Sequence, residues 1–131
     1  MKEILSINVV IDGAYDVNSM DESACMIPFH GESRCDNFTG IILPGGVDTQ
    51  RQKSGGVRTL SARYILEGTD CAGEHCRIFI ENNGSFEKDG SIITKPQIIT
   101  DSKELGWMMA ADLTVTVTGT ETGVNVSIFI K

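Results

Sequence analysis

The chain has 131 residues, a net charge of −7 and no cluster of basic residues. This length is typical of one domain, residues 1–131, which can bury enough surface to fold without a disulfide or a metal. An acidic chain that lacks a Lys/Arg-rich surface is unsuited to nucleic acid and to anionic membranes, so we expect neither as a partner. Its content of hydrophobic residues, 40%, is that of an ordinary soluble protein.

The N-terminal segment contains no apolar run of signal-peptide length, which predicts a cytoplasmic protein. The cysteines Cys25, Cys35, Cys71 and Cys76 do not have the spacing of a zinc motif, so we expect four free thiols. A metal site made of Cys71, His75 and Cys76 is a weaker alternative, because adjacent residues of a strand point to opposite faces. We expect no cofactor, since no phosphate-binding glycine loop precedes a helix.

Apolar and polar residues alternate with period two through most of the chain, which predicts β-strands. The expected strands cover residues 2–11, 26–33, 38–43, 59–67, 77–82, 97–100, 108–118 and 124–130, with a short polar segment at 47–52. Residues 13–22 and 85–96 are expected to form loops, and Asn82-Asn83-Gly84 to end a strand. Residues 101–105 are expected to form one helical turn, with Asp101 as its N-cap and Glu104 three residues later.

Two antiparallel hairpins are expected, one joining residues 59–67 to 77–82 and one formed by the last two strands. About eight or nine strands with short connections and no long helix predict an all-β antiparallel fold. A sheet of this size folds into a sandwich or closes into a barrel, and the pattern alone leaves both open. A barrel of about eight strands can hold one small ligand.

The run Leu43-Pro44-Gly45-Gly46-Val47-Asp48-Thr49-Gln50 resembles the Gly-Gly-x-Asp-Trp-Gln signature of the DUF3237 (UPF0311) family of small bacterial proteins. Later landmarks of that family are matched in order by Leu60 to Glu67, Asp70 to Gly73, Asn83-Gly84 and Trp107-Met108, so the resemblance covers roughly residues 30 to 130. Thr49 stands where the family usually has Trp, which implies a different ligand if that position lines the pocket. The resemblance implies a single antiparallel β-barrel, lipocalin-like (calycin-like), with at most one short helical turn. The family is broadly uncharacterised, so no reaction is implied.

The Pro44-Gly45-Gly46 turn places Asp48 and Gln50 on one face of the chain, because they are two residues apart. Asp48 is the candidate acid or base. Arg63 lies on the next strand between apolar neighbours, where an arginine is costly unless it meets an acid or a ligand. Arg63 faces solvent if the apolar side of its strand is the inner one, whereas the resemblance favours the barrel lumen.

Candidate ligand contacts, besides Gln50, are Tyr64, Glu67, Asn82, Trp107 and His30. Several have a plain structural alternative: Glu67 as a solvated charge, His30 as a hydrogen-bonded surface group and Trp107 as a core anchor. We expect Asp48, Gln50, Arg63 and Trp107 to converge on one concave region at or inside the barrel.

Three functions fit these residues. The first is binding of a small organic molecule, anionic or carbonyl-containing, in the barrel. The second is a cofactor-free enzyme of the acid/base isomerase, cyclase or lyase type that uses Asp48 and Arg63. The third is a purely structural or homo-oligomer-forming barrel, and a filled interior would favour it over the other two.

Overall fold

The computed structural model describes residues 1–131 and contains a ten-stranded sheet and one short 3-10 turn. The elements in chain order are β1 (Lys2–Ile11), β2 (Tyr15–Asn18), β3 (Glu22–Arg34), β4 (Phe38–Ile42), β5 (Val47–Lys53), β6 (Thr59–Asp70), β7 (His75–Phe86), β8 (Ile92–Thr100), η1 (Gly106–Met109), β9 (Leu113–Gly119) and β10 (Gly123–Ile130). The chain contains no helix with the length and apolarity needed to cross a membrane.

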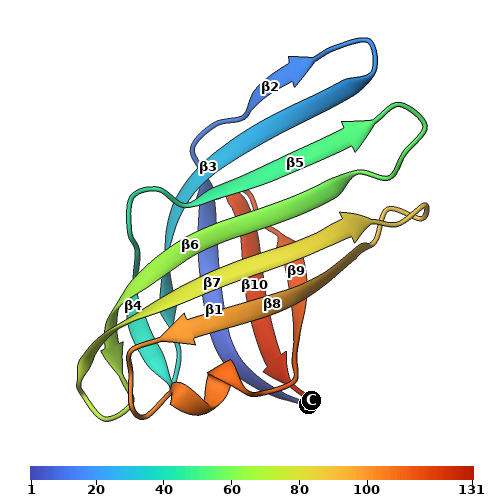
Figure 1. The fold of residues 1–131 in the computed structure, drawn as a ribbon. Coiled ribbons are helices and arrows are strands. Elements are labelled where there is room, and N and C mark those ends of the chain that lie inside the picture. Colours follow the sequence, from blue (N-terminus) through green and yellow to red (C-terminus); the bar gives the residue numbers. More distant parts are fainter.

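All strand pairs are antiparallel, in the order β8-β7-β6-β4-β3-β1-β10-β9. β5 pairs with β3 and β6, as β4 does, and β2 pairs with β3. The sheet curls until its end strands β8 and β9 lie next to each other (Figure 1), but no backbone hydrogen bond joins them. The predicted all-β antiparallel barrel with one helical turn is therefore confirmed, with a seam between β8 and β9 that side chains alone fill.

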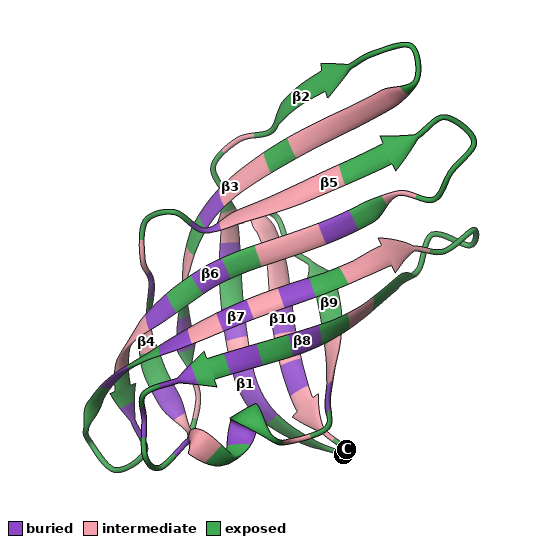
Figure 2. Cartoon of the chain, in the orientation of Figure 1, coloured by how far each residue is buried: buried purple, intermediate pink, exposed green.

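The core fills the lower half of the barrel, where the buried bands of several strands meet (Figure 2). Its centre is fully enclosed and includes aliphatic side chains from four strands, β1, β6, β7 and β10: Leu5, Ile7, Leu66, Ile78 and Ile128. The segment that holds η1 closes this end with the buried Leu105 and Met108. Above the core, the hairpins β2–β3 and β5–β6 extend outward and are much more exposed.

The two predicted hairpins are confirmed, with β6 paired to β7 and β9 to β10. Two expected loops are wrong, because Tyr15–Asn18 forms β2 and β8 begins at Ile92. The expected break at Asn82-Asn83-Gly84 is also wrong, since β7 runs through it to Phe86. A Cβ at Gly84 would collide with the carbonyl oxygen of Ile93, so glycine serves a close approach of two strands here and not a turn.

The helical turn lies later than predicted, at Gly106–Met109, and β9 begins only at Leu113. Asp101 is not an N-cap, because its Oδ1 accepts a hydrogen bond from the backbone N–H of Arg77 at 2.8 Å. The alternation of residues 113–118 was a valid strand signal, whereas Met108 belongs to the turn and packs into the core.

All four cysteines are free, as predicted. Cys76 is buried, and burial is the main reason why the pKa of its thiol is raised, which makes it a poor nucleophile. Nowhere in the chain do three His, Cys, Asp or Glu side chains gather as they would to hold a metal ion.

A buried carboxylate ties the β6–β7 turn to the segment that leads into η1. Asp70 accepts hydrogen bonds from the backbone N–H groups of Ala72 and Glu74, at 2.9 and 3.1 Å, and from the Ser102 hydroxyl at 2.6 Å. Ser102 Oγ in turn accepts the N–H of Leu105 at 3.1 Å. The Ser102 hydrogen bond and the two backbone donors hold the pKa of Asp70 below its ordinary value, against the opposing effect of burial.

We expect S102A to lower the melting temperature at neutral pH, because Asp70 loses its side-chain donor. A carboxyl with a lowered folded-state pKa stabilises the fold above its ordinary pKa of about 3.9 and loses that contribution as the pH falls through the folded-state value. The difference between S102A and the wild type should therefore shrink below about pH 4 in thermal unfolding scans. S91A removes the same 2.6 Å contact to Asp89, whose pKa Ser91 also lowers, but within an exposed loop that ties no other segment; it is the control and should show a smaller effect. A pH-independent effect of S102A would contradict this account.

A second expectation concerns Gly68, which lies directly opposite Gly40 where β6 and β4 approach closely. A Cβ at Gly68 would collide with the carbonyl oxygen of Thr39, so G68A should lower the free energy of unfolding by roughly 1–3 kcal/mol or more. G119A is the matched control, since nothing lies within 4 Å of a Cβ at that strand position. Equal denaturant midpoints for the two variants would show that the approach is not tight.

Candidate functional site

The Pro44-Gly45-Gly46 turn interrupts a strand that is otherwise continuous. β4 and β5 occupy one place between β3 and β6, and residues 43–46 bulge out between them. Gly45 has a φ of +111°, which an L side chain rarely adopts, and the carbonyl oxygen of Gly46 accepts the N–H of Phe29 at 3.1 Å. β5 therefore restarts in register with both neighbours, with Asp48 opposite Ile27 and Ala62.

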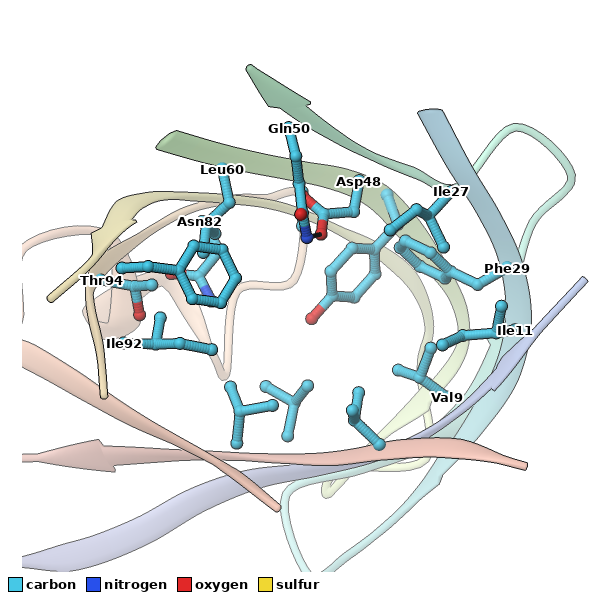
Figure 3. A pocket seen from close by; sticks show the side chains of 16 residues that line it. Val9, Ile11, Ile27, Phe29, Asp48, Gln50, Leu60, Asn82, Ile92 and Thr94 are labelled. Atoms are coloured by element: carbon cyan, nitrogen blue, oxygen red, sulfur yellow. Dashed lines mark hydrogen bonds between the residues drawn. The ribbon is translucent and has the colours of Figure 1, made fainter. Parts of the chain in front are cut away.

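Above the core, the barrel contains a partly open cavity of about 200 Å³ lined by 16 residues, of which 12 are hydrophobic. Side chains from strands all around the barrel project into it, including Val9, Ile27, Asp48, Asn82 and Ile92 (Figure 3). The lining is apolar except for a few groups, so each polar atom in it is conspicuous.

Three buried polar atoms have no hydrogen-bond partner, and all three belong to residues that line this cavity. They are Asp48 Oδ1, the Tyr64 hydroxyl and Asn82 Oδ1. Buried polar groups are almost always paired, and leaving one unpaired costs roughly 1–3 kcal/mol. All three therefore gather around one cavity, which makes it the candidate functional site.

The other oxygen of Asp48 is held from behind. Gln50 Nε2 donates to Asp48 Oδ2 at 2.9 Å, and Arg58 Nε donates to Gln50 Oε1 at 2.7 Å. The guanidinium polarises the amide, and the amide fixes the carboxylate. Asp48 thus has one oxygen in a hydrogen bond and one without a partner. The positive charge of this hydrogen-bonded chain, the Arg58 guanidinium, does not line the cavity.

Tyr64 is only 5% exposed, and its ring packs edge-on against Phe29 with ring centroids 5.4 Å apart. Burial raises the pKa of its hydroxyl, so the phenol stays protonated at every physiological pH. Its O–H is therefore an unsatisfied hydrogen-bond donor.

A small residue separates two of the three polar groups. Asp48 on β5, Ala62 on β6 and Asn82 on β7 are direct cross-strand partners in one row. Strands lie about 4.8 Å apart, so the Asp48 and Asn82 backbones are about 10 Å apart, with only a methyl group between them. The row therefore forms a notch with a polar side chain at each end. Tyr64 lies on the same face of β6, two residues after Ala62.

Asp48 and Gln50 come together as predicted, and Tyr64 and Asn82 line the same cavity. Arg63 does not join them, and the expectation that it lies in the lumen is wrong. Its side chain is 61% exposed and pairs with Glu81 at 2.7 Å on the outer face. The physical reason is the alternation of β6, whose apolar face with Ala62 and Tyr64 is the inner one.

The convergence of Trp107 with these residues is also wrong. Trp107 lies on η1 at the other end of the barrel, 43% exposed, because η1 follows the end of β8 that is remote from the cavity. Glu67 faces outward and pairs with Arg77 at 2.6 Å. His30 is exposed, with its Nδ1 2.7 Å from Asp12 Oδ1. These contacts leave both side chains outside the cavity.

Sequence reasoning did not identify Arg58 and Thr94. Arg58 follows a glycine-rich turn, and no periodicity marks it as the group behind Gln50. Thr94 lines the cavity from β8, within a segment predicted as a loop. The inward alternation of β8 would have indicated Thr94 if that strand had been recognised.

The fold and the cavity define a class, that of small antiparallel barrel-like proteins with a mainly apolar lumen and a few unpaired polar groups. The profile of the family described as a protein of unknown function, DUF3237, matches residues 1–130, and the chain belongs to this family.

Among its relatives, a UPF0311 protein of Clostridium acetobutylicum is 36% identical, over 82% of this chain and 78% of the relative. A crystal structure of a protein of unknown function from C. acetobutylicum is similar with a TM-score of 0.80 and 26% identity, covering 97% of this chain and 95% of the other. The fold is also shared with an unknown-function protein of Rhodopseudomonas palustris, at a TM-score of 0.77 and 20% identity over 97% and 93% of the two chains. An enzyme from Penicillium herquei has the same fold. Its TM-score is 0.71 and its sequence identity is 15%, over 98% of this chain and 92% of the other.

We expect Y64F to stabilise the protein, because it removes a buried hydroxyl that has no partner. The free energy of unfolding should rise by about 1 kcal/mol, measured by urea denaturation. Y15F, at the only other tyrosine, is the control and should have no effect, since Tyr15 is exposed. A loss of stability in Y64F would mean that the hydroxyl is already satisfied in the free protein, for example by water.

Proposed function

We propose that the protein binds one small, uncharged organic molecule in the lumen, with hydrogen-bond donors for Asp48 and Asn82 and an acceptor for Tyr64. The observation that carries this proposal is the gathering of three unpaired buried polar atoms around a single apolar cavity. Sites for small molecules have this composition, with apolar walls and a few placed polar groups that set orientation.

The size of the cavity sets the size of the ligand. An apolar cavity of about 150 Å³ holds benzene. The 200 Å³ of this lumen correspond to one substituted ring or two small fused rings. A cavity of this volume also argues against the purely structural alternative, in which side chains fill the barrel.

The charges around the cavity favour a neutral ligand. The only ionisable groups in its lining are Asp48 and the protonated Tyr64, and Arg63 lies outside. A carboxylate that lines an apolar cavity repels an anion. The oxygen of a carbonyl or hydroxyl compound can accept a hydrogen bond from Tyr64 without this electrostatic penalty. The proposed ligand is therefore neutral, and the anionic ligand that Arg63 suggested is excluded from the proposal.

Binding is testable with three ring compounds that share one frame: 2-indanol, indane and indane-2-carboxylate. We expect 2-indanol to bind about tenfold more tightly than indane, because it satisfies buried polar groups, and the carboxylate to bind most weakly. Two-dimensional NMR titration follows the side-chain amide signals of Asn82 and Gln50 directly.

The variant A62L fills the notch between Asp48 and Asn82. It should abolish the ligand-induced changes in the NMR signals of Asn82 and Gln50. I65F is its control, since Ile65 lies on the outer face of the same strand. Equal affinities for indane and 2-indanol, or unchanged binding in A62L, would reject the proposed site.

A further inference from the structure

We propose that this lumen catalyses enolisation, the transfer of a proton from the carbon next to a carbonyl group, with Asp48 as the base and Tyr64 as the donor to the carbonyl oxygen. This inference rests on the proposed function and adds a substrate class, namely small neutral ketones. The reason is that the two groups differ in kind, since an ionised carboxylate accepts a proton and a protonated phenol has a hydrogen to donate.

Asp48 has the features that a base needs. Gln50 and Arg58 fix one carboxylate oxygen through a chain of two hydrogen bonds, which sets the direction of the other oxygen. That second oxygen, Oδ1, is buried and has no partner. A general base must lie within about 3 Å of the proton it takes, and Oδ1 is the unengaged oxygen of a residue that lines the cavity.

Tyr64 has the features of an oxyanion donor. Its hydroxyl is buried, unpaired and held protonated by its apolar surroundings. Its ring is held against Phe29, so the O–H needs little reorganisation when charge develops on a ligand oxygen. A donor in an apolar, water-poor cavity stabilises such a charge far more than a donor in water does.

The spacing of the two groups suits one ketone. Ala62 is the cross-strand partner of Asp48, and Tyr64 lies two residues further along β6, about 7 Å away along the strand. The methyl group of Ala62 leaves room for a ligand ring above it. A carbonyl group and its neighbouring carbon can then span from the Tyr64 hydroxyl to Asp48, while Asn82 accepts a donor from the far side of the ring.

The step balances without any further reactant. Asp48 Oδ1 forms an O–H bond with the proton of the carbon, and the electron pair of the broken C–H bond forms a C=C bond. The electron pair of the C=O double bond moves to the oxygen, where the Tyr64 O–H stabilises the enolate. Return of the proton from Asp48 to the same carbon, or to another carbon of the enolate, restores a ketone. Nothing is oxidised or reduced.

The experiment uses the full chain in deuterated water with 2-indanone as the probe, and proton NMR follows the loss of its α-hydrogen signal. We expect the wild type to accelerate exchange over buffer, and D48N to reduce the enzymatic rate at least about 100-fold. Y64F should reduce it by a similar factor. Because Y64F is expected to fold at least as well as the wild type, it keeps the test valid if D48N does not fold.

The matched controls are D12N and Y15F, which make the same chemical changes on the outer surface and should exchange at the wild-type rate. 2-Indanol should inhibit exchange by competition for the lumen. Lumenal binding of 2-indanone without acceleration, or equal rates in D48N and the wild type, overturns the catalytic inference and leaves the proposed function standing. Failure of both 2-indanone and 2-indanol to bind the lumen rejects the two together.

Discussion

The inward direction of Asp48 depends on the number of residues in one bulge. Between the pairs Glu32–Ile41 and Pro28–Val47, β3 advances by four residues while the β4–β5 strand advances by six. The excess is two, and an even excess keeps the alternation of side chains in step, so Ile42, Asp48 and Gln50 all point inward. An excess of one would direct Asp48 and Gln50 to solvent and remove the polar groups from the lumen. The polar groups of the cavity therefore depend on the strand register, which decides that Asp48 and Gln50 face inward.

The two ends of the barrel treat buried polar groups in opposite ways. At the lower end, Asp70 has three donors and Ser102 is satisfied both as donor and as acceptor, which ties the turn to the segment that carries η1. At the cavity, three polar atoms have no partner. A protein that satisfies its buried groups at one end and leaves them open at the other has given up stability in a defined place, which is characteristic of functional sites.

The sequence was sufficient for the fold class and for half of the site. Period-two alternation located most strands, and the glycine turn singled out Asp48 and Gln50 because two residues separate them. Arg63 was placed in the lumen because the family resemblance favoured that position. The alternation of β6 already directs its side chain outward, where it lies opposite Glu81. Trp107 could not be placed, since its position depends on the long-range contact between Ser102 and Asp70, which are 32 residues apart. The strands β2 and β8 were missed because tertiary pairing overrides a local composition rich in turn-forming residues.

The edge strands β8 and β9 meet without a backbone ladder between them. In a closed barrel the perimeter is set by backbone hydrogen bonds, so widening it breaks a ladder. Here the lining contributed by Thr94 on β8 and Val117 on β9 faces the cavity from the two sides of the seam. The distance between these walls can change at the expense of side-chain packing alone, with every ladder of the sheet intact. The three unpaired polar groups, on β5, β6 and β7, all lie on the continuous side of the sheet.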